Sequence, residues 1–244
     1  MTGSGTTQAA RWSTAHDTAP QCCRMGALAE LGHDLVQPVH AMQLLVHQLQ
    51  AVSEEPARQE LITQLQGVSE AIASMFRNLL DCARLDAGSL QPCLDTVRLS
   101  PVLARVLGDH ARRCRPRNLR LGMMGSTALW VRADPMLLDR ILDNLLDNAV
   151  KFTPSGQVVV HCSREDATVR IEIADTGVGM GCADVDNAQR PFFRGASAHE
   201  LGLDGMGLGL ANATVLARLM GGDVALRSAP GLGTTVVLTL PSAP

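Results

Sequence analysis

The apolar residues between Leu28 and Cys82 recur at alternating intervals of three and four residues. They form two stretches, the first made of Leu28, Leu31, Leu35, Pro38, Met42, Leu45 and Leu49, and the second of Leu61, Leu65, Val68, Ile72, Met75, Leu79 and Cys82. This spacing is a heptad repeat, which predicts two helices of roughly 30 residues with a short turn between them. The hairpin that they form is too narrow to bury its apolar seam alone. We therefore expect two copies to pair as a four-helix bundle, which makes the protein a homodimer.

A different pattern begins after Gly88, where short strand-like runs alternate with helical ones. Strands are predicted at 119–124, 129–132, 157–164, 168–174, 223–228 and 233–240, and helices at 100–110, 135–152 and 207–220. Such a mixture favours an α+β two-layer sandwich, in which helices cover one face of a mixed sheet. The predicted organisation is a tail or linker at 1–20, the helical hairpin at 21–88 and the sandwich at 99–241.

Composition excludes several classes of protein. Hydrophobic residues make up 46% and charged residues 18% of the 244 residues, which is typical of a globular protein. The net charge of −3 and the aromatic content of 2% argue against a nucleic-acid partner. No apolar run approaches the ~20 residues that a membrane span needs. The seven cysteines are odd in number and form no Cys-x-x-Cys pair, so we expect a reducing, cytoplasmic location.

One predicted helix carries a polar row beside its apolar stripe. Asn144, Asn148 and Lys151 are spaced by four and three residues, so they share one face of the helix at 135–152. Asparagine in the middle of a helix is unfavourable, and Lys151 is the only lysine among the 21 basic residues. These features indicate a functional face, although a plain amphipathic surface helix is the alternative.

Two glycine-rich segments follow farther along the chain. Asp175-Thr-Gly-Val-Gly179 comes directly after a predicted strand, and Gly205-Met-Gly-Leu-Gly-Leu210 opens a predicted helix. Glycine permits close approach of the backbone to a ligand, and N–H groups at the start of a helix bind phosphate. Each segment alone is also compatible with an ordinary turn or loop. The second is neither a Rossmann fingerprint nor a Walker A loop, because it lacks the βαβ context and the Gly-Lys-Ser/Thr ending.

Together, in this order and spacing, the three motifs resemble the nucleotide-binding boxes of the ATPase superfamily that includes gyrase, Hsp90, MutL and the sensor histidine kinases. LDNLLDNAVKFTPSG at 142–156 is similar to the asparagine box, DTGVGM at 175–180 to the first glycine box, PFFRG at 191–195 to the phenylalanine box and GMGLGL at 205–210 to the second glycine box. The resemblance covers residues 99–241. It implies the two-layer sandwich of that superfamily, with ATP and Mg²⁺ as cofactors.

The resemblance also implies roles for the matching residues. Asn148 would bind magnesium, Lys151 would contact phosphate, and Asp175 would accept a hydrogen bond from the adenine amino group, with Thr234 nearby. The glycines of the second box would hold a lid at the phosphates. The full set of implied nucleotide contacts is Asn144, Asn148, Lys151, Asp175, Gly177, Gly179, Gly205, Gly207, Gly209, Leu210 and Thr234.

Position 144 separates the branches of this superfamily. Members that hydrolyse ATP have a glutamate four residues before the magnesium asparagine, and here that position is Asn144. An amide cannot act as a general base. Transfer of the phosphoryl group to a side chain is therefore favoured over hydrolysis.

A candidate acceptor lies in the first predicted helix. GHDLVQPV at 32–39 resembles the phosphoacceptor box of histidine kinases, which implies that His33 is the acceptor and that Asp34 takes or orients its proton. The heptad independently places His33 at position f, the outermost one. His40 and His47 also fall at f, but the ~10 Å between successive histidines is too long for a shared metal ion.

Gln37 departs from the family pattern, which has Thr or Asn at this position. It lies one helical turn after His33, so both side chains face the same surface. The Gln37 amide could orient the water that dephosphorylates a partner, because it has the same donor and acceptor groups as Asn. The alternative is a good helix former on a solvated face.

These resemblances imply a histidine protein kinase of a two-component system. It would transfer the γ-phosphate of ATP to His33 and then to an aspartate in the receiver domain of a response regulator. We recognise no sensor domain, so we expect input from a longer parent chain or a partner. A non-kinase histidine phosphotransferase or dimer scaffold with a degenerate ATP domain is the main alternative. An ATPase clamp of the gyrase or MutL type would need an acidic residue at position 144 and no acceptor hairpin.

Overall fold

The computed structural model describes residues 36, 38–52, 54–86, 90–114, 119–126, 128–195 and 207–243. The predicted tail at 1–20 lies outside the described residues, and so do His33, Asp34, Gln37 and Gly205. The expectations for these residues stay predictions. Among the described residues, no helix combines the length and the apolar character needed to cross a membrane.

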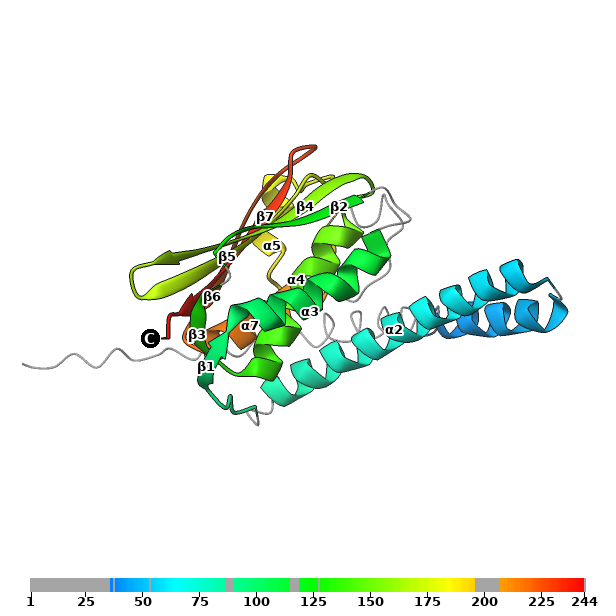
Figure 1. The fold of residues 1–244 in the computed structure, drawn as a ribbon, viewed down its shortest axis with the longest axis horizontal. Coiled ribbons are helices and arrows are strands. Elements are labelled where there is room, and N and C mark those ends of the chain that lie inside the picture. The colour runs from blue at the N-terminus through cyan, green and yellow to red at the C-terminus, as the bar shows by residue number, and fades with distance from the viewer. Residues whose placement is uncertain are drawn as a thin grey trace, which may run out of the picture.

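The N-terminal described part is helical, as the heptad predicts. Residues 38–51 form one helix and Glu55–Asp86 form the next, α2, with Pro56 in its first turn. The two run side by side in opposite directions (Figure 1), and Val52 and Leu61 help to line a hollow between them. The described heptad residues of both helices, such as Met42 and Leu65, remain half-buried in the single chain.

The rest of the described chain is built on a five-stranded mixed sheet. Its strands stand in the order β2 (Leu119–Gly125), β4 (Gly156–Glu165), β5 (Thr168–Asp175), β7 (Gly233–Pro241) and β6 (Asp223–Ala229). The β2–β4 pair is parallel and the other three pairs are antiparallel. The predicted mixed sheet is confirmed.

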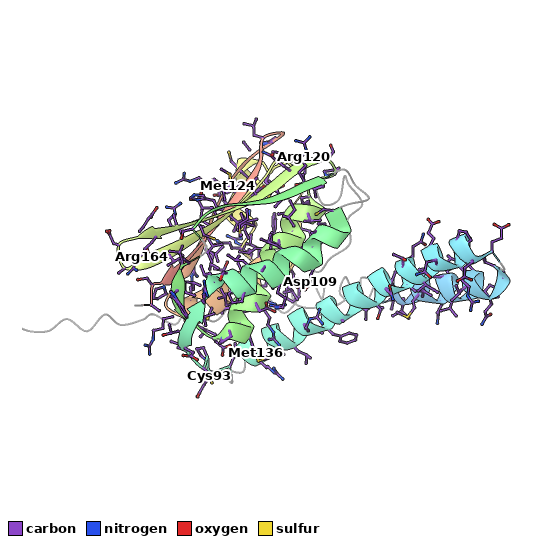
Figure 2. All side chains as sticks on the ribbon, in the orientation of Figure 1. Cys93, Asp109, Arg120, Met124, Met136 and Arg164 are labelled. Atoms are coloured by element: carbon purple, nitrogen blue, oxygen red, sulfur yellow. The ribbon has the colours of Figure 1, made fainter. Side chains whose placement is uncertain are left out.

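Three helices cover one face of this sheet, α3 (Leu99–Cys114), α4 (Pro135–Lys151) and α7 (Gly209–Leu219) (Figure 1). Alternate residues in the middle of β4 and β5 point into the layer between sheet and helices and are buried, namely Val158, Val160, Cys162, Val169, Ile171 and Ile173. Side chains crowd this layer (Figure 2). The two-layer sandwich expected from the sequence is therefore correct.

Two short elements were not expected from the sequence. Strand β1 (Asp95–Arg98) pairs with β3 (Trp130–Ala133), and helix α5 (Cys182–Asn187) follows the first glycine box. A strand of four residues has too few alternating positions to give a pattern, and its partner is about 35 residues away in the chain.

Helix α4 positions the predicted asparagines. Asp134 caps its N-terminus by accepting from the N–H groups of Met136 and Leu137, and Pro135 takes the first helical position. One face of the helix is fully buried in the sandwich core; its members are Leu138, Ile141, Leu142 and Leu145. Burial of this stripe fixes the rotation of α4 and hence the direction of its polar row.

Candidate nucleotide-binding site

The asparagine box and the second glycine box meet at the α4–α7 interface. Asn144 is 9% exposed, and Asn148 is half-buried one turn later. Gly209 begins α7 beside them: a Cβ added to Gly209 would lie 3.6 Å from Nδ2 of Asn148 and 3.9 Å from Cβ of Asn144. Leu210, the next residue, is half-buried. Residues about 60 positions apart in the chain thus lie at one surface.

Lys151 closes the polar row at the last residue of α4. Its side chain is half-buried, and its Nζ lies 5.7 Å from the centre of the Phe152 ring. An ammonium group over an aromatic ring is weakly attracted to it. The side chain therefore has a preferred position at the same end of the helix as Asn148.

Asp175, the last residue of β5, is held by the backbone around it. Its Oδ1 atom accepts from the N–H of Gly177 at 2.8 Å and from the N–H of Thr234 at 3.1 Å. Burial raises the pKa of the Asp175 carboxyl, while these two N–H groups and the Thr153 hydroxyl lower it in part. Asp175 and Thr234 are therefore direct neighbours in the structure.

The first glycine box packs closely against the end of α4 on one side and against the end of β6 on the other. A Cβ at Gly177 would collide with the carbonyl oxygen of Phe152, at the end of α4. Gly179 has a φ of +66°, and a Cβ there would collide with the carbonyl oxygen of Ala229, the last residue of β6. Only glycine fits these two close approaches, which explains the spacing of the motif.

The phenylalanine box contacts the second glycine box. The N–H of Phe192 donates to the carbonyl of Gly207 at 3.1 Å, and a Cβ at Gly207 would collide with the carbonyl of Phe193. Phe192 has a φ of +65°. A bulky residue in this region is uncommon and costs on the order of 1 kcal/mol, so the surrounding structure holds this strained junction.

Two polar residues of the site were missed by the sequence reasoning. Thr153 is fully buried and its hydroxyl donates to the carbonyl of Ala149 at 2.7 Å. Ser228 of β6 lies within 2.9 Å of polar atoms from three residues of the site. Thr153 lies within the asparagine box at 142–156, which could have pointed to it, whereas no local pattern marks Ser228.

The oxygen atoms that the site offers fit a magnesium ion that is held mainly by the phosphates of a bound nucleotide. Among the described residues there is no group of three or more His, Cys, Asp or Glu side chains that could hold a metal ion. Magnesium needs no such cage when one or two protein oxygens and substrate phosphates bind it. The carboxamide of Asn148 can supply such an oxygen, because it is half-buried beside the start of α7.

Comparisons with known proteins agree with this geometry. Residues 133–244 match the family described as histidine kinase-, DNA gyrase B- and HSP90-like ATPase. The chain is 34% identical over 222 residues to the virulence sensor protein BvgS of Bordetella bronchiseptica, covering 87% of this chain and 18% of the relative. It is 28% identical over 234 residues to an uncharacterised sensor-like histidine kinase of Rhizobium meliloti, covering 93% of this chain and 45% of the relative. The chain thus spans less than half the length of these two relatives.

Solved structures show the same arrangement. Full-length ShkA in complex with AMPPNP superposes with a TM-score of 0.64 and 25% identity, covering 93% of this chain and 46% of that one. The mycobacterial sensor histidine kinase MprB superposes with a TM-score of 0.56 and 29% identity, covering 62% of this chain and 99% of that one.

The sandwich and its converging boxes define the ATPase fold shared by gyrase, Hsp90 and the histidine kinases. Within that class, the similarity reaches into the helices before the sandwich, and relatives matched over that length are named sensor or sensor-like histidine kinases. The chain is thus similar to the catalytic core of sensor histidine kinases.

Proposed function

We propose that this chain is an ATP-dependent protein-histidine kinase of a two-component system, which phosphorylates His33 and then an aspartate of a response-regulator receiver domain. One observation carries the nucleotide half of this proposal. Gly209 lies against Asn144 and Asn148, at the α4–α7 interface. A helix start in contact with an amide row can bind phosphates and their magnesium ion on one surface.

The described residues supply distinct parts of the nucleotide site. Asp175 would accept from the adenine amino group, because its carboxylate is fixed in direction by two backbone N–H groups. Lys151 would contact phosphate, and Asn148 would hold magnesium, which neutralises charge on the phosphates when bound. Gly207 and Gly209, together with the undescribed Gly205, would approach the phosphates with their backbone.

Asn144 favours transfer over hydrolysis. Its side chain is buried at the face that meets α7, where a hydrolytic enzyme of this fold would need a carboxylate. The amide cannot remove a proton from water. The γ-phosphoryl group would therefore pass to a protein side chain.

His33 is the proposed acceptor of the phosphoryl group. His40 and His47, which follow it at intervals of seven residues, are both exposed on the described helix. The heptad puts His33 on the same outer face. One imidazole nitrogen would attack the γ-phosphorus while the bond to the bridging oxygen breaks and ADP leaves, and Asp34 would take the proton from the other nitrogen.

Dimerisation through the hairpin is part of the proposal. Its heptad residues stay half-buried in one chain, and Val39, Val46, Phe76 and Leu80 are exposed apolar residues of the two helices. A second copy would bury both sets.

The test is incubation of the protein with γ-labelled ATP and Mg²⁺, followed by acid treatment. We expect an acid-labile label that His33→Gln abolishes. His40→Gln is the matched control, because it changes an exposed histidine at the same heptad position and should leave labelling intact. Label that survives in His33→Gln and maps to His40 or His47 would overturn the acceptor assignment. Absence of ATP binding by the unmodified chain would favour the degenerate phosphotransferase instead.

A further inference from the structure

Three polar residues form a row across the ends of neighbouring strands in the nucleotide site. Ser228 of β6 pairs directly with Thr234 of β7. The β5–β7 register, continued by one residue beyond its last pair, sets Thr234 beside Asp175. By strand alternation, all three point to the helix-covered face. Each is half-buried, so the row borders space that a ligand can reach.

The hydrogen bonds of Ser228 fix the direction of every proton in this row. Its Oγ lies 2.8 Å from the backbone nitrogen of Met180, 2.9 Å from the carbonyl oxygen of Gly233 and 2.8 Å from Oγ1 of Thr234. A carbonyl can only accept, so the single hydroxyl proton of Ser228 goes to Gly233. The Thr234 hydroxyl must then donate to Ser228, which uses the one donor and two acceptor sites of a serine hydroxyl in full.

This arrangement leaves only acceptors for a ligand at Thr234 and Asp175. The Thr234 hydroxyl proton is directed at Ser228, and the Thr234 backbone N–H is bonded to Oδ1 of Asp175. What remains available is lone pairs on the Thr234 hydroxyl and on the Asp175 carboxylate. A base that presents an amino group can donate a hydrogen bond to such a lone pair. A base that presents an oxo group would place one acceptor against another, so no hydrogen bond forms.

We propose that Ser228 is a positioning residue for base specificity, which holds the Thr234 hydroxyl as an acceptor and so makes the site prefer a purine with an amino group at position 6 over one with an oxo group. This rests on the proposed function, in which ATP binds at Asp175. Ser228 itself touches no ligand in this arrangement and acts through Thr234.

The test compares the dissociation constants of ATP and inosine triphosphate for the full chain. Inosine triphosphate carries an oxo group where ATP carries its amino group. The unmodified protein should prefer ATP. Ser228→Ala frees the Thr234 hydroxyl to rotate and donate, so the ATP preference should fall about five- to tenfold, the value of one hydrogen bond. Ser228→Thr keeps a hydroxyl and should keep most of the preference.

Two controls separate specificity from a general loss of structure. Ser163→Ala removes a half-buried serine from the opposite face of the same sheet and should leave the ratio unchanged. In a Thr234→Val background, Ser228→Ala should have no further effect on the ratio, because the hydroxyl that it orients is gone.

The outcomes distinguish this inference from the proposed function. A Ser228→Ala variant that weakens ATP and inosine triphosphate equally, or neither, overturns the role in specificity while nucleotide binding stands. An unmodified chain that binds neither nucleotide overturns the proposed function and this inference together.

Discussion

The helical hairpin and the sandwich differ in how a single chain buries their apolar residues. In the sandwich, Leu138, Leu142 and Leu145 are at most 1% exposed and are enclosed by the sheet and the neighbouring helices. In the hairpin, heptad residues such as Leu45 are only half-buried, and Phe76 is 52% exposed. The difference teaches that the sandwich encloses its apolar residues within one chain, whereas the described hairpin leaves its heptad residues partly accessible, so we expect a second copy to cover them.

The largest expected effect is on the sandwich core. Leu142→Ala should lower the free energy of unfolding by about 3 kcal/mol, because it leaves a cavity in a fully enclosed layer. Leu45→Ala, made in the half-buried hairpin seam, should cost less than half of that at low protein concentration. Urea unfolding of both variants, followed by circular dichroism, checks the pair. Equal losses at low concentration would show that the hairpin core is complete in one chain.

A charge in the hairpin should break the homodimer. Val46→Glu places a carboxylate at an apolar position that is 43% exposed in one chain, and we expect the dimer dissociation constant to rise about a hundredfold. Met124→Glu is the matched control, since Met124 is 63% exposed on an edge strand of the sandwich (Figure 2). Analytical ultracentrifugation measures both. A protein that is monomeric before any substitution would contradict the hairpin comparison.

Asp175→Asn should separate nucleotide affinity from stability within the sandwich. The amide oxygen can still accept from Gly177 and Thr234, but the charge that strengthens the bond to an amino group is lost, so ATP affinity should fall about 10- to 100-fold. Because burial raises the pKa of Asp175, the folded protein favours the protonated carboxyl. The contribution of Asp175 to the free energy of unfolding is therefore present at low pH and is lost as the pH rises through that raised pKa. At pH 7 without nucleotide, the variant should therefore be as stable as the unmodified protein or more stable.

The same shift in pKa gives a pH dependence. On acidification, ATP affinity should begin to fall above the ordinary aspartate pKa of 3.8, as the carboxylate of Asp175 takes up a proton. Calorimetric titrations from pH 7 downward check this, and Asp175→Asn should not show the same fall. A variant that binds ATP as tightly as the unmodified chain would exclude Asp175 as the adenine contact.

The smallest expected effect belongs to the hairpin surface. Gln37→Ala should slow dephosphorylation of the regulator about tenfold, near 1.4 kcal/mol, through loss of water positioning. Autophosphorylation of His33 and ATP binding in the sandwich should be nearly unchanged. Phosphate release from a phosphorylated receiver domain measures the first and γ-labelled ATP the second. Equal loss of both activities would indicate a folding or docking defect. No loss of either activity would indicate that Gln37 is only a helix-forming residue on a solvated face.

The sequence by itself determined the regular elements and the nucleotide motifs. Heptad spacing predicted the helices on either side of residue 53, and alternation predicted the five strands of the main sheet, because these signals are local and repeat many times. The position of Asn144 relative to Asn148 was likewise readable as a helix face. Glycine spacing marked the loop at 175–179 and the segment that leads into α7 from Gly207, since few other residues fit close backbone approaches.

Tertiary structure alone decided which distant groups meet. Strand β1 is too short for a pattern and exists because β3 pairs with it. The contact of Gly209 with Asn144, and the row formed by Ser228, Thr234 and Asp175, depend on sheet order and register. Serine has no preferred pattern that would mark it as a ligand-site residue, and its importance here arises from three partners on other segments. Local spacing fixes a residue's face on its own element, whereas strand pairing and helix packing fix what that face contacts.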